Sequence, residues 1–234
     1  MSKSCLILLP GQLCDSALWT AQVDALADIA EIRVADLTLD DTVEAMAARV
    51  LADAPARFAV CGLSLGGYVA FEIVRRAAER VTHLGLMNTS ARPDTVDRSA
   101  ERERSVRAAR VGTFKGVTAH FLPSILHPAH AADTRMAELV LAMTERVGRV
   151  AFEKQQNAAI LRPDCRPLLP AIRCPTLVVG GKEDQITPPM LQIEIATDIQ
   201  DARLEILDPC GHLAPIEQAE TVNRLMRAWL GSSA

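Results

Sequence analysis

Three residues far apart in the sequence, Ser64, Asp184 and His212, have the side chains that nucleophilic catalysis requires. A serine hydroxyl is not ionised near neutral pH, so it attacks a carbonyl carbon only when a neighbouring base removes its proton. A histidine can act as that base when a carboxylate orients its ring. If the three side chains meet in space, the chemistry that they predict is acyl transfer.

The segment around Ser64 has the pattern of a strand, a tight turn and a helix. The apolar residues 58–61 lead into Gly62-Leu63-Ser64-Leu65-Gly66, and an apolar helical pattern follows at once. A strand that turns into a helix within a few residues brings the two elements very close, so the turn needs glycine at 62 and 66. The serine hydroxyl would then lie at the tip of the turn, beside the amides of a helix N-terminus. The alternative is a glycine-rich turn that merely contains a serine.

The elements around these residues predict where the three side chains lie. Apolar runs predict six strands, over residues 4–9, 31–35, 57–62, 81–88, 176–180 and 203–207. Ser64, Asp184 and His212 each come just past the C-terminal end of one of these strands. In a parallel sheet those ends share one edge, where ligands bind. We therefore expect the serine, the aspartate and the histidine to converge at that edge.

Helical patterns alternate with the strands and predict an α/β fold. Apolar residues recur at helical spacing over residues 19–30, 43–50, 68–74, 191–195 and 222–229. Because such alternation produces parallel strands, we expect a mostly parallel sheet of about six strands with helices on both faces. A chain of 234 residues is commonly one domain in this class, so we expect a single domain over residues 1–234.

Residues 91–169 break the alternation. They hold helical patterns over 97–110, 131–147 and 149–161 and no convincing strand. Inserted at the edge where the three side chains converge, this stretch predicts a helical cap over the site. Residues 97–110 are dense in arginine and glutamate, and we interpret them as a solvated helix with opposite charges rather than as an anion-binding element.

The composition argues against several other classes of protein. Hydrophobic residues make up 49% and charged residues 23%, as in ordinary soluble domains. A net charge of −4 without a basic stripe offers no general attraction to nucleic acid. We find no signal peptide in the sequence and no segment long enough to span a bilayer. We therefore expect a cytoplasmic protein that takes a small acyl substrate and needs no cofactor, and the oligomeric state is left open.

The six cysteines lack the spacing of metal ligands, and there is no C-x-x-C pair. Cys5 and Cys61 fall in strand patterns, and we expect them to be small core residues. Cys210 is two residues from His212, but we reject it as a nucleophile because the turn supplies a better-placed hydroxyl at Ser64. Free thiols in a reducing compartment and no metal site are the expectation.

The chain resembles the α/β-hydrolase family over nearly its whole length. The resemblance rests on Leu8-Leu9-Pro10-Gly11-Gln12, on the turn around Ser64, on the residues leading to Asp184, on Gly211-His212 and on the order Ser…Asp…His. It implies the α/β-hydrolase fold, with Ser64 as nucleophile, Asp184 as acid and His212 as base. Many members have His-Gly where this chain has Pro10-Gly11. Since that histidine is usually structural, the departure leaves the chemistry standing.

The same resemblance implies an oxyanion hole made of two backbone N–H groups. One belongs to Leu65, the residue after the nucleophile. The second should come from the loop after the first strand, where Gln12 is the residue that the motif favours and Leu13 is the alternative.

Other acids and histidines compete for roles in the site. Glu183 adjoins Asp184 and Asp208 precedes His212, but the family pattern has aspartate at the position of Asp184, and we expect Asp208 to support a turn. The remaining histidines at 83, 120, 127 and 130 are expected to be ordinary, although one of the last three could contact substrate from the cap.

The function that these residues favour is hydrolysis of a small carboxylic ester or thioester through an acyl-enzyme. Lactone hydrolysis, carbon–carbon bond hydrolysis and perhydrolysis use the same three side chains and stay open. The serine excludes the aspartate-nucleophile branch of the family. An alternative of another class is a non-catalytic ligand-binding module, which is less favoured because such chains generally lose one of the three residues.

Overall fold

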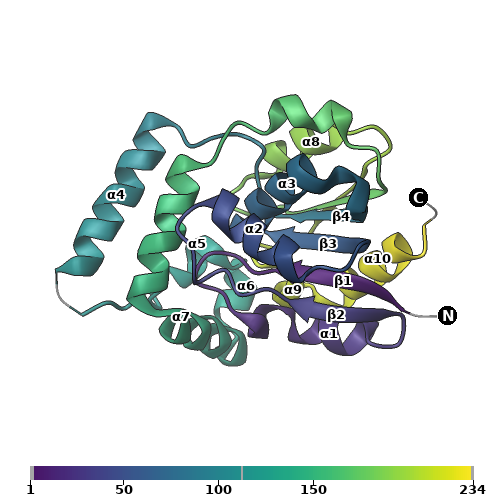
Figure 1. The fold of residues 1–234 in the computed structure, drawn as a ribbon. Coiled ribbons are helices and arrows are strands. Elements are labelled where there is room, and N and C mark those ends of the chain that lie inside the picture. The colour runs from purple at the N-terminus through teal and green to yellow at the C-terminus, as the bar shows by residue number, and fades with distance from the viewer. Residues whose placement is uncertain (1–2, 112, 233–234) are drawn as a thin grey trace.

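A parallel sheet forms the centre of the molecule in the computed structural model, which describes residues 3–111 and 113–232 (Figure 1). The strands are β1 (Ser4–Leu9), β2 (Ala30–Val34), β3 (Phe58–Leu63), β4 (Val81–Met87), β5 (Thr176–Gly181) and β6 (Arg203–Leu207). Their order is β2-β1-β3-β4-β5-β6, and every pairing is parallel. The expected sheet of six strands is therefore confirmed, with bounds that shift by one residue at most. Residue 112 of the expected cap and both ends of the expected domain lie outside the described residues.

Helices cover both faces of the sheet because the central strands are apolar on both sides. Along β1, Ile7 and Leu9 belong to one hydrophobic cluster, while Leu6 and Leu8 belong to the other. The first cluster packs against α2 (Val43–Asp53), α3 (Leu65–Ala77) and α8 (Pro189–Asp198). The second packs against α1 (Thr20–Leu26), α9 (Ala214–Glu217) and α10 (Ala219–Leu230). Each buried large aliphatic side chain contributes about 1.5–3 kcal/mol, so the two clusters fix the positions of the strand ends.

Helices fill the chain between β4 and β5, as the sequence predicts for residues 91–169. They are α4 (Val96–Arg110), α5 (Leu122–Ile125), α6 (Pro128–Ala131) and α7 (Thr134–Leu161), followed by a 3-10 turn (Arg166–Ala171). Gly148 has φ 72° and ψ 177° inside α7, which explains why the periodicity indicates two helices there. No strand occurs in this stretch among its described residues. We call residues 91–169 the helical insertion.

The helical insertion lies to one side of the sheet, at the edge where the strands end. In Figure 1, α4 lies at the far left of the molecule, next to α7, and α7 lies between α4 and the sheet. α7 also contacts α2 and α3, the helices that follow β2 and β3. This arrangement brings residues of the helical insertion close to the C-terminal ends of the strands.

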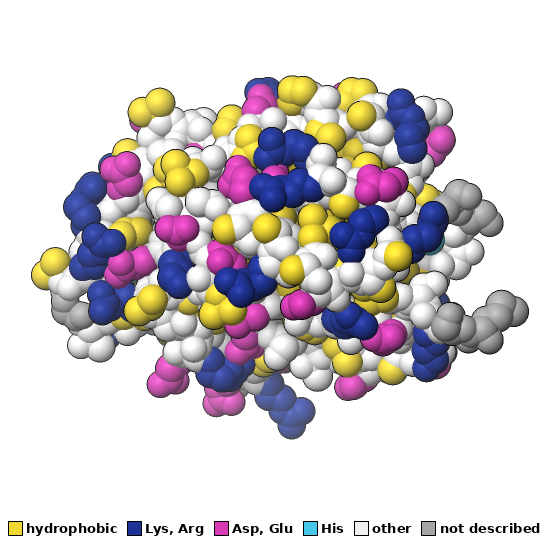
Figure 2. Space-filling view, viewed as in Figure 1, with side chains coloured by type: hydrophobic (Ala, Val, Ile, Leu, Met, Phe, Trp, Pro, Cys, Tyr) yellow, Lys and Arg dark blue, Asp and Glu magenta, His cyan; other side chains and the backbone are white. Residues whose placement is uncertain are grey.

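The surface carries charges of both signs. On the face shown in Figure 2, Lys and Arg side chains alternate with Asp and Glu, and neither sign forms a continuous patch there. None of the helices in the described part of the chain has the length and hydropathy needed to cross a membrane.

Candidate active site

Ser64 lies in the turn between β3 and α3 with a strained backbone. Its φ of 53° and ψ of −112° place a residue with a Cβ in a region that costs on the order of 1–3 kcal/mol. Four hydrogen bonds hold its backbone there, and the three shortest are the following. The Ser64 N–H donates to the carbonyl of Met87 (3.0 Å), and its own carbonyl accepts from the Thr89 hydroxyl (2.8 Å) and the Gly67 N–H (2.9 Å). The serine is thus fixed at the tip of the turn, as the sequence predicts.

Close approach of the backbone explains the two glycines of this turn. A Cβ added to Gly62 would lie 2.2 Å from the carbonyl oxygen of Gly66, and one added to Gly66 would lie 2.2 Å from that of Leu9. Both distances are well inside van der Waals contact with backbone atoms that cannot move aside. Alanine at either position would therefore force β3, α3 and β1 apart.

The carboxylate of Asp184 is buried and fully hydrogen-bonded. Oδ1 accepts from the N–H groups of Ile186 (2.8 Å) and Thr187 (2.9 Å). Oδ2 accepts from the Thr187 hydroxyl (2.7 Å), the Asn88 side-chain amide (2.9 Å) and Nδ1 of His212 (2.8 Å). Burial by itself would raise the pKa of Asp184, but His212 and these donors favour the anion and lower the pKa from 3.8 to about 2. Asp184 is therefore ionised throughout the physiological range.

His212 is oriented by that carboxylate. Because an ionised carboxylate only accepts hydrogen bonds, Nδ1 of His212 carries the proton and donates it to Asp184. Nε2 of the neutral ring is then an acceptor, and it has no hydrogen-bond partner in the described part of the chain. His212 and Ser64 line the same cavity, so this second nitrogen is available to a group at the serine.

The loop that carries His212 is held by Glu217, a residue to which the sequence analysis assigns no role. The Glu217 side chain is buried, and it accepts from the N–H of Gly211 (2.9 Å) before the histidine and of Leu213 (3.0 Å) after it. It also accepts from the N–H of His127 (2.7 Å) in the helical insertion. The N–H of His212 itself donates to the carbonyl of Ile125 (2.6 Å). The histidine loop and residues 125–127 are therefore bonded to each other directly.

Asn88 is a second residue that the sequence analysis does not identify. It follows β4 with a φ of 45°, and its side-chain amide donates both to Asp184 and to the carbonyl of Gly211 (3.1 Å). It thus fixes the distance between the loops that carry Asp184 and His212. A polar residue directly after a strand, at the same edge as the other three, is the signal that points to it.

The backbone N–H groups of Leu65 and Gln12, near Ser64, have no hydrogen-bond partner among the described residues. Leu65 begins α3, where the first N–H groups of a helix lack acceptors within the helix. Leu13, the alternative to Gln12, donates its N–H to Oε1 of Gln155 (3.0 Å). The geometry of this loop therefore favours Gln12 over Leu13 as a free donor.

A cavity of about 950 Å³ opens beside these groups. At the sheet edge it is lined by Gln12, Leu13, Ser64, Leu65, Tyr68 and His212, and in the helical insertion by Arg98, Arg102, Phe121, Ile125, Val140 and Phe152, among others. The lining thus combines apolar side chains with many polar and charged ones, among them five arginines. A cavity of this size suits a small-molecule ligand.

The competing residues have other partners. Glu183 accepts from the N–H of Cys210 (3.1 Å), and Asp208 pairs with Lys182 (2.5 Å) at the surface. Burial raises the pKa of the Cys210 thiol, so this sulfur stays protonated and is a poor nucleophile.

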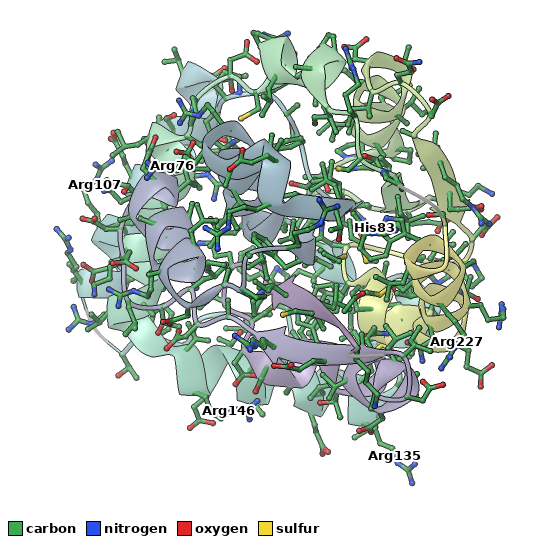
Figure 3. The ribbon with its side chains drawn as sticks, turned by 45° about the vertical axis from the view of Figure 1, so that its right-hand side comes forward. Arg76, His83, Arg107, Arg135, Arg146 and Arg227 are labelled. Carbon is green, nitrogen blue, oxygen red and sulfur yellow. The ribbon has the colours of Figure 1, made fainter. Side chains whose placement is uncertain are left out.

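The histidines outside the site make structural contacts. His83 packs edge-on against Trp229, and Nδ1 of His130 lies 3.0 Å from the buried carboxylate of Glu217. Figure 3 labels His83 beside the C-terminal helix α10. Within the described residues, no group of three or more His, Cys, Asp or Glu side chains has the geometry to hold a metal ion.

Comparison with known proteins shows the family over nearly the whole chain. The profile of the family described as "Alpha/beta hydrolase family" matches residues 6–225. A pimeloyl-[acyl-carrier protein] methyl ester esterase from Aromatoleum aromaticum is 27% identical, over 91% of this chain and 92% of that one. A putative carbamate hydrolase, RutD, from Rhizobium rhizogenes is also 27% identical, over 96% of this chain and 92% of that one.

Among solved structures, a thermophilic esterase from Thermogutta terrifontis, solved with malate bound, superimposes with a TM-score of 0.87. It is 29% identical, and the match covers 98% of this chain and 90% of that chain. The enol-lactonase from Burkholderia xenovorans has a TM-score of 0.86 at 23% identity, with 99% and 93% covered, and shows the fold alone. The fold class expected from the sequence is thus confirmed.

Proposed function

Because the chain belongs to the alpha/beta hydrolase family and is a hydrolase, we propose that it cleaves a small carboxylic ester or thioester through an acyl-enzyme on Ser64. The observation that carries the proposal is the 2.8 Å hydrogen bond from His212 Nδ1 to Asp184, beside a cavity that Ser64 also lines. This bond sets the tautomer in which Nε2 can accept a proton.

In the first half of the cycle, His212 Nε2 takes the proton of the Ser64 hydroxyl as its oxygen attacks the substrate carbonyl. Asp184 stabilises the imidazolium that forms without taking the proton itself. The negative charge that develops on the carbonyl oxygen is bound by the N–H groups of Leu65 and Gln12. Since both N–H groups lack other partners, their binding of the oxyanion replaces no existing hydrogen bond.

In the second half, the proton on His212 passes to the leaving alcohol or thiol, and the carbonyl–oxygen or carbonyl–sulfur bond breaks. A water that gives its proton to His212 then attacks the acyl-enzyme, and His212 passes that proton to the Ser64 oxygen as the carboxylic acid leaves. No group beyond the three side chains and the two N–H groups is required. Ester or thioester hydrolysis is preferred for that reason, and lactone and carbon–carbon bond hydrolysis, which use the same three side chains, are the alternatives.

We also propose that residues 91–169 act as a cap within a single domain, and that the protein is cytoplasmic. The first is supported by the residues of α4, α5 and α7 that line the cavity. The second is supported by the six free thiols.

The proposal is tested with an activated short acyl ester and a fluorophosphonate probe. We expect the purified protein to hydrolyse the ester, and Ser64→Ala to lower kcat by about 10⁴-fold or more. The probe should add one phosphonyl group to the parent protein, on Ser64, and none to Ser64→Ala. Ser16→Ala, which changes an exposed serine that does not line the cavity, is the matched control. Hydrolysis by Ser64→Ala at the parental rate would exclude this nucleophile, and a parent that neither hydrolyses esters nor reacts with the probe would support the binding module.

A further inference from the structure

A buried cluster of charges lies in the wall of the cavity, where the helical insertion meets the sheet edge. Asp94, whose side chain is 2% exposed, pairs with Arg102 (2.6 Å) and with Arg162 (2.5 Å). The Arg102 and Arg162 side chains are 12% and 7% exposed. Two cations share one anion, so the cluster has a net positive charge in a place that water reaches poorly. Such a charge is costly unless an anion joins it.

Arg102 and Arg162 differ in the groups that their N–H donors contact. Arg162 donates to the carbonyls of Arg92 (3.0 Å) and Ala159 (2.6 Å), and it lies 4.2 Å over the ring of Tyr68. Its role is to connect elements of the fold. The hydrogen bonds of Arg102 go to side-chain oxygens instead.

Arg102 uses its Nε on Asp94 and its Nη1 on the side-chain oxygens of Gln156 (2.7 Å) and Gln12 (3.2 Å). Its Nη2 has no partner among the described residues. Arg102 therefore has a charged donor left over, and it lines the cavity.

Gln12 supplies a second free donor at the same place. Its Oε1 accepts from Arg102, while its Nε2 is buried without a hydrogen-bond partner among the described residues. A buried amide nitrogen left unpaired costs about 1–3 kcal/mol, so it marks a place where an acceptor is missing. Gln12 Nε2 and Arg102 Nη2 are both donors that lack an acceptor.

The backbone of Gln12 connects this pair to the reaction. Its N–H is the second donor that we propose for the oxyanion, and its side-chain oxygen accepts a hydrogen bond from Arg102. A substrate whose carbonyl oxygen binds the Gln12 N–H would run its acyl chain along this side chain. The far end of such a chain would then lie near Arg102, because the Gln12 side chain ends at its guanidinium.

The other charges that line the cavity do not compete for this position. Arg98 pairs with Glu101 (3.3 Å), and Arg92 pairs with Glu194 (2.9 Å). Arg104 is exposed to solvent. The net positive charge of the buried wall is therefore concentrated at Arg102.

We propose that Arg102 and Gln12 bind a carboxylate at the far end of the acyl chain, so that the substrates are monoesters or monothioesters of short dicarboxylic acids. This inference rests on the proposed function. A guanidinium presents planar donors that match a carboxylate, and one free anion balances the net charge of the cluster. A phosphate monoester, with close to two charges and three acceptor oxygens, would exceed what the cluster offers.

The test compares two matched series of methyl esters, with methanol release as the readout. One series is the monomethyl esters of succinic, glutaric and adipic acids, and the other has a carboxamide in place of the free carboxylate. We expect the parent protein to prefer the carboxylate series in kcat/KM. Arg102→Gln should lower that preference by about 10- to 100-fold, the effect of one charge-assisted hydrogen bond, and Arg102→Lys should recover part of it.

Arg107→Gln is the matched control. Arg107 lies on the same helix with its side chain 64% exposed, pairs with Glu103, does not line the cavity, and is at the outer side of the molecule in Figure 3. It should keep the parental preference. The carboxylate site would be overturned if Arg102→Gln and Arg107→Gln preferred the carboxylate series to the same extent. It would also be overturned if the parent protein cleaved both series equally well.

A second measurement keeps the inference testable if Arg102→Gln does not fold. Calorimetry with Ser64→Ala measures binding of the uncleaved esters, and monomethyl glutarate should bind at least about tenfold more tightly than its carboxamide counterpart. Equal affinities would overturn the carboxylate site whatever the outcome for Ser64. Conversely, hydrolysis that persists in Ser64→Ala would reject the nucleophile and leave this binding comparison unaffected.

Discussion

Leu13 donates its backbone N–H to the side-chain oxygen of Gln155 over 3.0 Å, in a fully buried contact. Leu13 has a φ of 58°, a conformation that a leucine adopts only when its surroundings hold it. Gln155 also donates to the carbonyl of Leu37 (3.2 Å). One side chain of α7 thus fixes the loops that follow β1 and β2. The loop after β1 is also the one that presents the Gln12 N–H.

Replacing Gln155 should therefore impair catalysis more than substrate binding. In Gln155→Ala the buried Leu13 N–H loses its acceptor, which costs about 1–3 kcal/mol of folding stability and allows the loop to move. Because the oxyanion donor acts mainly in the transition state, we expect kcat to fall by about tenfold with a smaller change in KM. Steady-state kinetics and urea unfolding of the same preparation measure both effects.

Asn157→Ala is the control for this change. Asn157 lies on the same helix, and its side chain bonds to the carbonyl of Asp41 (3.1 Å), away from the loop after β1. Its kcat should match the parental value. A Gln155→Ala protein with unchanged kcat would show that the Leu13 bond does not support the oxyanion hole.

The assignment of the acid is tested by comparing Asp184→Asn with Asp208→Asn. An amide at position 184 would favour the wrong tautomer of His212, and in other proteins with this arrangement the corresponding change lowers kcat by about 10⁴-fold. Asp208 is half-exposed and pairs with Lys182, so its replacement should leave kcat within about twofold. Large losses in both variants, or in Asp208→Asn alone, would contradict the assignment of Asp184.

Asp184 also predicts a loss of stability in acid. Its pKa is lowered from 3.8 to about 2 in the folded protein, so the folded state binds this proton more weakly than the unfolded state does. The resulting stabilisation, about 2 kcal/mol, is complete above pH 4 and is lost as the pH falls toward 2. Urea unfolding between pH 2 and pH 6 measures it. The difference in unfolding free energy between the parent and Asp184→Asn should shrink as the pH falls from 6 to 2. A difference that does not depend on pH would contradict the lowered pKa of Asp184.

The sheet could be predicted from the sequence because its signals are local. The apolar runs of β1 to β6 and the helical patterns between them depend on residues within one element, and their order along the chain implies parallel pairing. The turn at Ser64 could likewise be predicted, since its glycines mark the close approach of the backbone that the structure has there. Asp184 and His212 could be placed at the same edge because each directly follows a strand.

The residues that support the site could not be predicted, because their partners are distant in the sequence. Asn88 and Gln155 act through contacts with Asp184 and Leu13 that arise only in the folded chain. Glu217 is five residues from His212, but nothing in its neighbourhood shows that its carboxylate will be buried. These roles depend on contacts that exist only in the folded chain, whereas the periodicity of the sequence reports on single elements.

The interpretation of residues 97–110 as a solvated helix is correct for most of α4 and wrong for one residue. Glu103 and Arg107 form the expected exposed pair, whereas Arg102 points into the cavity wall. A helix with arginines on every side gives no periodic signal to distinguish the two. Arg102 differs from the other arginines of α4 because the fold places Asp94 and Gln12 in contact with it.

The bonds between the histidine loop and residues 125–127 have a consequence for how specificity can diverge in such a protein. His212 donates to Ile125, and Glu217 joins His127 to both neighbours of the histidine. Mutations that reshape α5 or α6 for a new substrate therefore disturb His212, the general base that we propose, at the same time. Among the described residues, α4 forms no hydrogen bond with the histidine loop, so substitutions along its inner face can change substrate choice while the proposed reaction centre stays as it is.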